Sequence, residues 1–303
     1  MMSKSAFTSS SPFPVALLIS IFILSCGGGS DSKSHENDSA LFTEAEKEIL
    51  SDITKIIADL PPPSVVPNTI QQIGTTYNPD LINSMDKLSA YLIEDSKAAL
   101  NLGIYGTDIG YLIEYDQVQE SLERMNACKQ LAERLGVSTA FDLTLMQKYE
   151  AAMGNHDELV KLLNETILLA EKRLESSDRI NMAAMVLTGS FIEGMYLAVR
   201  VLEDTPLDQQ TQEEKDRVLE PLVQLVLGQK QPLLDILSML DKLPSNEDIA
   251  TLTVELNILR RLFESDLAEV EISMANDPDF VLNQEMLLDI NLEVIRIRNK
   301  IVQ

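Results

Sequence analysis

The sequence is poor in several residue types on which protein sites often depend. Its 303 residues include no Trp, two Cys and two His, and aromatic residues make up 5% of the chain. A structural zinc site of four side chains would need all four Cys and His residues, and their spacing matches no zinc motif. We therefore expect no metal and no cofactor.

Basic residues are also scarce. Lys and Arg number 24 against 48 Asp and Glu, so the formal net charge is −24 at pH 7. Phosphate backbones and anionic lipid head groups repel a chain of this charge, which excludes nucleic acid as a partner. The hydrophobic content of 45% is sufficient for a sizeable core, and we expect a folded protein.

The apolar run near the start of the chain is too short to cross a membrane. It extends over ten residues, Val15 to Leu24, whereas a transmembrane helix needs about 20. Lys4 precedes the run, and Ser25 and Cys26 follow it. This order of a basic, an apolar and a small-residue region predicts a signal peptide over residues 1–25.

The tetrapeptide Ile23-Leu24-Ser25-Cys26 resembles the lipobox of bacterial lipoproteins. In that family the Cys is acylated on sulfur, the leader is cut before it and the new amine is acylated. The resemblance implies lipidation of Cys26, attachment to a membrane through acyl chains and a place in the bacterial cell envelope. Gly27, where some lipoproteins have Asp, further implies the outer membrane, at its periplasmic or its surface face. The alternative is a secreted protein with an unmodified Cys.

Residues 26–40 predict a flexible tether. Gly27 to Ala40 contain no apolar residue larger than Ala and are rich in Gly, Ser, Asp and Asn, a composition typical of flexible linkers. Fourteen such residues have a root-mean-square reach of roughly 20 Å. A helical domain over residues 41–303 follows, with a candidate internal boundary near residues 204–211.

From Leu41 onward, apolar residues recur at three- and four-residue steps, without the alternation typical of strands. This pattern predicts an all-α fold of about ten antiparallel helices, in one bundle or two stacked bundles. Irregular pairs like those of tetratricopeptide repeats are an alternative, although no 34-residue period is found. Apolar stripes on the last two helices predict that these pack as antiparallel neighbours. The predicted helices are residues 43–60, 79–101, 107–135, 138–153, 156–175, 178–203, 212–227, 230–243, 246–275 and 283–302.

One segment, Met182 to Val199, contains a single charged residue, Glu193, among 18 residues. A helix that is apolar on all sides must be surrounded, which predicts the central helix of the bundle. A transmembrane helix is the alternative, and the Glu in the middle argues against it. Ser190, Gly194 and Ala198 recur at four-residue steps and predict a groove where another helix approaches closely.

Residues 101–116 are unusual because they contain three Gly and three Tyr. We interpret the glycines as a break between two helices, with Thr107 capping the second. That helix would place an acid and two phenols on one face, and they could form a pocket with the acid of the central helix. The alternatives are a tight corner with buried tyrosine rings and a structural ion pair for Glu193. The candidate pocket residues are Tyr105, Asp108, Tyr111, Tyr115 and Glu193.

Two functions are consistent with this sequence. The first is a non-catalytic protein-interaction or scaffold module, anchored by lipid and bound to another envelope protein. The second is a small-ligand-binding protein or unrecognised enzyme that uses the candidate pocket. No phosphate loop, serine elbow or His cluster is present, so no catalytic residue is assigned. Cys128 lies on an apolar stripe and is predicted to be a core thiol.

The mature part also resembles uncharacterised all-helical lipoproteins of the Bacteroidota. The resemblance covers residues 80–200 and rests on length, acidity and the Gly-Tyr segment. It implies an all-helical envelope lipoprotein and no particular activity.

Overall fold

Helices account for every regular element in the part of the chain that the computed structural model describes. The described residues are 47–49, 51–176, 179–204, 212–276 and 287–303. Within these ranges the all-α fold is confirmed. The predicted leader, Cys26, the tether and the candidate boundary at residues 205–211 lie outside them.

Long α-helices alternate with a few short helical turns along the chain. The first helical segment includes residues 47–49 and 51–59. The later elements are α2 (Val65–Ile73), η1 (Pro79–Leu81), η2 (Met85–Lys87), α3 (Leu88–Tyr91), α4 (Asp95–Glu114), α5 (Val118–Arg134), η3 (Ser138–Phe141), α6 (Leu143–Ala151), α7 (His156–Ser176), α8 (Ile180–Asp204), α9 (Gln212–Leu227), α10 (Lys230–Lys242), α11 (Glu247–Asn276) and α12 (Leu288–Ile301).

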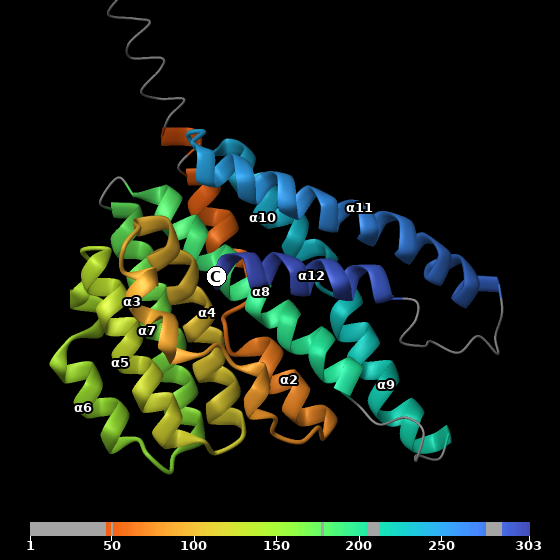
Figure 1. The fold of residues 1–303 in the computed structure, drawn as a ribbon, viewed down its shortest axis with the longest axis horizontal. Coiled ribbons are helices and arrows are strands. Elements are labelled where there is room, and N and C mark those ends of the chain that lie inside the picture. The colour runs from red at the N-terminus through yellow and green to blue at the C-terminus, as the bar shows by residue number, and fades with distance from the viewer. Residues whose placement is uncertain (1–46, 50, 177–178, 205–211, 277–286) are drawn as a thin grey trace, which may run out of the picture. The chain divides into compact units, whose positions relative to one another are not determined.

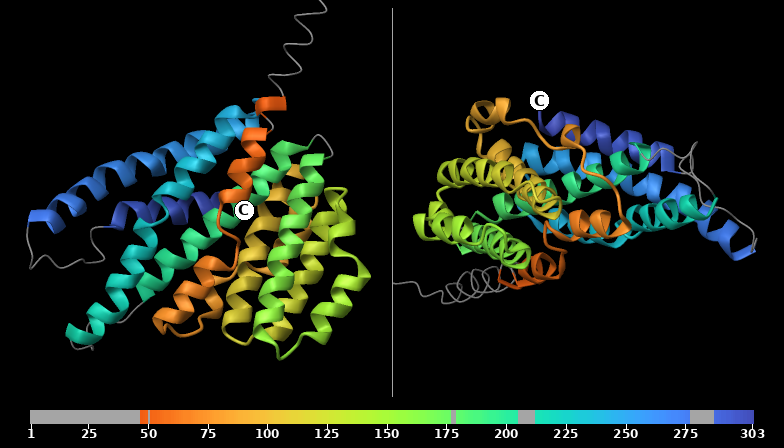
Figure 2. Two further views of the ribbon diagram at one scale, coloured as in Figure 1. Left: turned by 180° about the vertical axis from the view of Figure 1, so that it is seen from behind. Right: turned by 90° about the horizontal axis from the view of Figure 1, so that it is seen from below.

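The helix α8 lies at the centre of this arrangement (Figures 1 and 2). It contacts α2, α4, α7, α9, α10 and α12, so its apolar residues meet neighbours on several sides. Its length and composition would suffice for a membrane span, but 78% of its most apolar stretch is buried inside the body. The central-helix prediction is therefore confirmed.

The predicted break at residues 101–116 is wrong, because α4 runs through it without interruption. A Cβ at Gly103 would overlap the carbonyl oxygen of Val186 and come within 3.0 Å of the Ser190 Oγ. A Cβ at Gly189 would overlap the Leu100 carbonyl. These glycines therefore allow α4 and α8 to pack backbone against backbone, which offsets their low helix propensity of about 1 kcal/mol each.

Thr107 is not a helix cap. It lies inside α4, and its hydroxyl lies within hydrogen-bond distance of two carbonyl oxygens, those of Gly103 (3.3 Å) and Ser190 (3.2 Å). The Ser190 hydroxyl in turn donates to the Gly103 carbonyl at 3.2 Å. The polar side chains at the crossing thus connect α4 to α8.

The predicted place of closest helix approach also needs correction. A Cβ at Gly194 would meet the Val66 side chain at 3.4 Å, an ordinary contact distance. The closest approach is one turn earlier, at Gly189 and Ser190. Ser190 of the predicted stripe does lie at the close crossing with α4, whereas Gly194 of the same stripe contacts α2 at an ordinary distance.

The region between the first helix and α4 differs from the prediction as well. A helix was predicted over residues 79–101, whereas the chain forms the short elements η1, η2 and α3 before α4 begins. The segment predicted as a loop contains α2, in which Pro67 lies in the first turn, where proline is tolerated. Asn78 accepts a hydrogen bond from the Asp80 N–H and so caps η1.

Glycine in the left-handed conformation follows three of the described helices. Gly74 has φ +92°, Gly136 has φ +70° and Gly154 has φ +90°. The break between α4 and α5 is instead made by Asp116, with φ +57°, a conformation that Asp tolerates better than most residues. The helix α9 continues through Pro221.

The two C-terminal helices pack together, as their apolar stripes predict. Glu255 of α11 pairs with Arg296 of α12 and with Lys300, whose Nζ lies 2.7 Å from Glu255 Oε1. The helix α12 also contacts α8, so the end of the chain is bound to the central helix.

Candidate functional site

A buried ion pair joins α8 to α12. The guanidinium of Arg298 donates two hydrogen bonds of 3.0 Å to the two carboxylate oxygens of Glu193. Glu193 has no exposed surface and Arg298 is 7% exposed. The Tyr196 ring lies 4.4 Å from the Arg298 Cζ, in a cation–π contact. The structure therefore shows the ion-pair alternative for Glu193.

Asp108 lies close to this pair but is not ion-paired. Its Oδ2 accepts a hydrogen bond of 3.0 Å from the Asn83 N–H, and its Oδ1 is buried without a partner among the described residues. Burial, and next the negative charge of Glu193, raise the pKa of Asp108 well above its usual value. We therefore expect the Asp108 carboxyl to hold its proton more tightly than an exposed Asp does.

Tyrosine hydroxyls bind the surrounding backbone to this cluster. Tyr105 donates to the Ser84 carbonyl at 3.0 Å, and Tyr91 donates to the Val302 carbonyl at 3.1 Å. Burial raises the pKa of Tyr105. These tyrosines are neutral donors that hold the loop after η1 and the C-terminus against α4.

Tyr111 and Tyr115 belong to a second group of rings. Their centroids lie 4.8 Å apart, and the Tyr77 centroid lies 5.8 Å from each. Tyr111 accepts from the Asn78 N–H at 3.0 Å, and the hydroxyls of Tyr115 and Thr75 lie 2.6 Å apart. Burial raises the pKa of Tyr111 to about 12.

The five candidate residues thus fall into two groups. Glu193 belongs to the ion pair, Asp108 lies near it and Tyr105 lies near Asp108, whereas Tyr111 and the half-buried Tyr115 pack against Tyr77. None of the five lines either of the two pockets described below. Their polar groups connect helices to one another.

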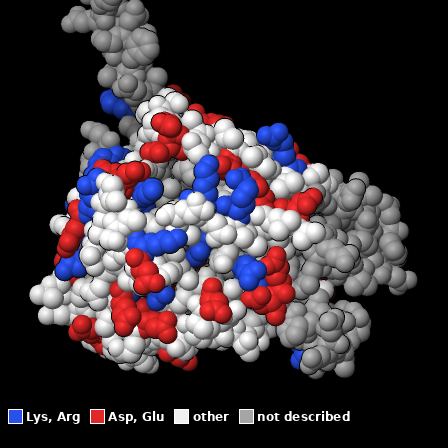
Figure 3. Space-filling model, viewed as in Figure 1, with Lys and Arg blue, Asp and Glu red and all other residues white. Residues whose placement is uncertain are grey.

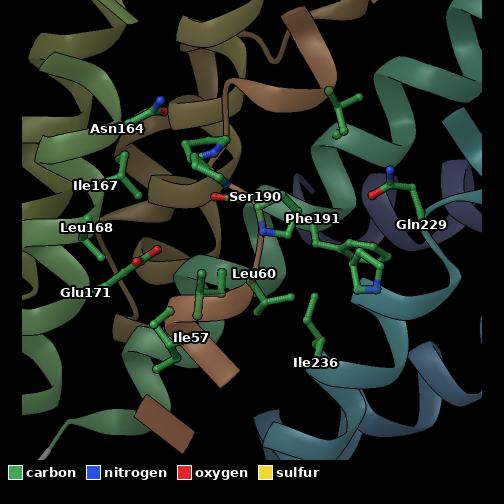
Figure 4. A pocket seen from close by; sticks show the side chains of 18 of the residues that line it. Ile57, Leu60, Asn164, Ile167, Leu168, Glu171, Ser190, Phe191, Gln229 and Ile236 are labelled. Atoms are coloured by element: carbon green, nitrogen blue, oxygen red, sulfur yellow. The ribbon is translucent and has the colours of Figure 1, made fainter. Parts of the chain in front are cut away.

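A partly apolar pocket lies elsewhere, among the end of the first helix, α2, α7, α8 and α10 (Figure 4). Its volume is about 280 Å³. Pro61 and Pro62, which line it, are exposed, so the pocket reaches the surface. Its apolar wall includes Ile57, Leu60, Ile167, Leu187, Phe191 and Ile236.

An acid, Glu171 of α7, extends into this pocket (Figure 4). It is 4% exposed, and no described side chain forms a hydrogen bond or ion pair with its carboxyl group. Burial, and next the negative charge of Glu175, raise the pKa of Glu171 to about 8. At pH 7 the pocket therefore contains a mostly protonated acid. Asn164, on the same wall, has a buried Oδ1 without a described partner.

A second pocket is more polar and lies at the start of α7. His156 Nε2 lies 3.0 Å from Glu114 Oε2, and the Asn68 amide donates to both Glu114 oxygens at 3.2 Å. Burial lowers the pKa of His156, but hydrogen bonds to Asp157 and Glu114 outweigh it, so the pKa is raised above 6.5. The Glu158 N–H donates to Asn155 Oδ1 at 3.3 Å, so Asn155 caps the start of α7.

Charged side chains of both signs lie on the surface, and the described thiol lies in the core. On the face seen in Figure 3, acidic and basic side chains are interspersed. Cys128 is fully buried, and burial raises the pKa of its thiol, which confirms the predicted core position.

Glu171 is not among the site residues predicted from the sequence. It occupies a position on the apolar stripe of α7, four residues after Ile167 and three before Leu174, both of which are buried. An acid at a position where the three- and four-residue pattern requires an apolar side chain is a detectable signal. Glu193 interrupts the apolar pattern of α8 in the same way as Glu171 interrupts that of α7.

We compared the chain with known protein families, curated proteins and solved structures. No family model, curated protein or solved structure matches this chain.

Proposed function

We propose that this chain is a lipid-anchored helical protein of the bacterial cell envelope that binds a small apolar molecule without catalysing its conversion. The observation that supports it best is the pocket beside Glu171, whose mainly apolar wall and single buried acid are typical of small-molecule sites. The site is formed by residues of five helical segments rather than by one loop.

A pocket-filling variant tests the binding proposal. A Cβ at Gly194 meets only the Val66 side chain at 3.4 Å and longer, and Gly194 lines the pocket. Gly194→Leu should therefore fill the space and abolish binding of small apolar probes in calorimetry, while Gly194→Ala should weaken it much less. Equal binding by the two variants, both folded, would show that the probes bind elsewhere.

The anchor is the second part of this proposal and is supported by the lipobox and the tether. Two or three acyl chains provide roughly 0.8 kcal/mol per buried CH₂, which is sufficient for stable attachment. Cys26→Ala should abolish fatty-acid labelling and leave an uncleaved precursor or a protein in the soluble fraction. Labelling that persists in Cys26→Ala would refute the anchor.

A protein-interaction or scaffold role is the second candidate function. It is favoured by Leu288 and Leu292, which lie one turn apart on α12 and are 52% and 55% exposed. Cross-linking in intact cells should capture an envelope protein, and Leu288→Asp with Leu292→Asp should abolish that capture. Leu143→Asp, at a still more exposed position on α6 (69%), is the control and should retain it.

A further inference from the structure

The chemistry of the pocket beside Glu171 restricts what it can bind. Figure 4 shows Glu171 extending from α7 toward the side of the pocket formed by Ile57 and Leu60. A buried polar group without a partner is costly, and a ligand that supplies the partner removes that cost. The volume of about 280 Å³ suits a small ligand, because an engineered cavity of about 150 Å³ holds benzene.

The charges around Glu171 favour a cation. Glu175 lies one turn further along α7, and Glu165 of the same helix lines the pocket. The first helix with Pro61 to Pro63, α2, α8, Gln229 and α10 contribute the other lining residues. Among all the lining residues described, none is Lys, Arg or His. An anionic ligand would therefore meet carboxyl groups and no described counter-ion.

The second unpaired atom requires a donor. Asn164 lies seven residues before Glu171 on α7, roughly 10 Å along the helix axis. Its amide nitrogen donates to the Ser64 hydroxyl at 2.9 Å, which leaves Oδ1 as a buried acceptor. An ammonium group donates three hydrogen bonds and accepts none, so it suits a pocket whose unpaired oxygens are acceptors. Because Asn164 and Glu171 are too far apart for one ammonium group to bind both, the charged Glu171 carboxylate is the expected partner.

We propose that the pocket binds a small apolar amine, whose ammonium group pairs with Glu171 while its hydrocarbon body lies against Leu60, Ile167 and Phe191. This inference rests on the proposed function, because it names the ligand class of the same pocket. When the ammonium group enters, the Glu171 carboxyl group gives its proton to the solvent. One cation and one carboxylate then form a neutral pair.

Calorimetry with 2-phenylethylamine and its neutral counterpart 2-phenylethanol tests the proposal. The full-length protein is reconstituted in phosphatidylcholine vesicles, so that no detergent competes for the pocket, and empty vesicles provide the blank. At pH 7 the amine should bind at least tenfold more tightly than the alcohol. Titrations in buffers of different ionisation enthalpy should show close to one proton released per amine bound.

The pH dependence gives an independent measure. Burial raises the pKa of Glu171 to about 8, with Glu175 adding to the shift. Binding that releases one proton strengthens by about tenfold per pH unit below that pKa. The affinity for the amine should therefore rise about tenfold between pH 6 and pH 7, whereas the affinity for the alcohol should not change.

Two variants separate the outcomes. Glu171→Gln should lose the proton release and the preference for the amine. Glu158→Gln, on the same helix with a side chain that is 43% exposed, should behave like the unsubstituted protein. Alcohol that binds as tightly as the amine, without proton release, would overturn the amine class and leave the pocket proposal standing. If neither probe binds more tightly than it does to Gly194→Leu, both proposals fail. The proton count in the unsubstituted protein decides the matter without any variant.

Discussion

Arg298, in the last helical turns of the chain, neutralises Glu193 in the middle of the central helix through two hydrogen bonds of 3.0 Å. The two residues are 105 positions apart in the sequence. Both are buried, so water solvates neither charge well, and each depends on the other. The pair therefore links the position of α12 to the core of the body.

The ion pair predicts a strongly non-additive response to mutation. Arg298→Met should lower the free energy of unfolding by roughly 3–5 kcal/mol, because it leaves Glu193 buried and uncompensated. Glu193→Leu should have a similar cost. The double variant should be considerably more stable than the sum of the two losses predicts. Urea unfolding of all four proteins measures the coupling, and additive losses would contradict the pairing.

The close crossing of α4 and α8 predicts that a single methyl group is harmful at one glycine and tolerated at another. Gly189→Ala should destabilise by roughly 1–3 kcal/mol or more, because its Cβ would overlap the Leu100 carbonyl. Gly194→Ala, five residues later on the same helix, should be neutral or stabilising by up to about 1 kcal/mol. Melting temperatures measured side by side test this. Equal melting temperatures would contradict the crossing.

Glu171 predicts a pH-dependent cost of folding. Its pKa is raised from 4.5 to about 8 by burial and by Glu175, so between these values the folded state retains a proton that the unfolded state has lost. The stability contributed by Glu171 is therefore present below pH 4.5 and decreases as the pH rises toward 8. Glu171→Gln should gain stability over the unsubstituted protein across this range, by roughly 1–4 kcal/mol.

The control for this titration is Glu158→Gln. Its stability relative to the unsubstituted protein should stay nearly constant from pH 5 to pH 8, since 43% of the Glu158 side chain is exposed to water. Chemical unfolding at pH 5, 6.5 and 8 is the measurement. If the Glu171→Gln and Glu158→Gln curves ran parallel, Glu171 would not be a buried acid.

His156 predicts the loss of a weaker interaction at high pH. Burial lowers its pKa, but Asp157 and Glu114 raise it more, so the folded pKa exceeds 6.5. The pairing with Glu114 should therefore stabilise fully below pH 6.5 and fade as the pH rises through the raised pKa. The side chain is 40% exposed, and the expected effect is roughly 0.2–1 kcal/mol.

Replacement of each histidine in turn separates this effect from general acid sensitivity. His156→Gln should lower the melting temperature at pH 5.5 and not at pH 8.5. His35→Gln, in the predicted tether, should change neither. A deficit of His156→Gln that persists at pH 8.5 would show that the imidazole acts without its charge.

The periodicity of apolar residues predicted the helical class and the central position of α8, because both depend on which residues must avoid water. Glycine was the main source of error. Gly103 was interpreted as a break, whereas the structure uses it where α8 passes against α4. A missing side chain has the same appearance in a sequence whether it permits a turn or a close approach. Only the partner helix distinguishes the two.

The candidate pocket, like the glycines, could be predicted from the sequence only in part. The sequence identified Asp108 and Glu193 as unusual, and the two do lie near one another. Whether such a cluster opens to solvent depends on the packing of α12, which supplies Arg298 from the far end of the chain. The apolar pocket beside Glu171 combines residues from five helical segments, and no local pattern records such a combination.

The position of Arg298 has a consequence for how the protein is synthesised. A ribosome completes α8 long before it reaches α12, so the nascent chain contains Glu193 without its counter-ion until α12 emerges. Closing the core earlier would bury that charge alone, at a cost of several kcal/mol. We therefore expect chains truncated before α12 to stay open and accessible to protease, with the docking of α12 acting as the step that commits the polypeptide to its folded form.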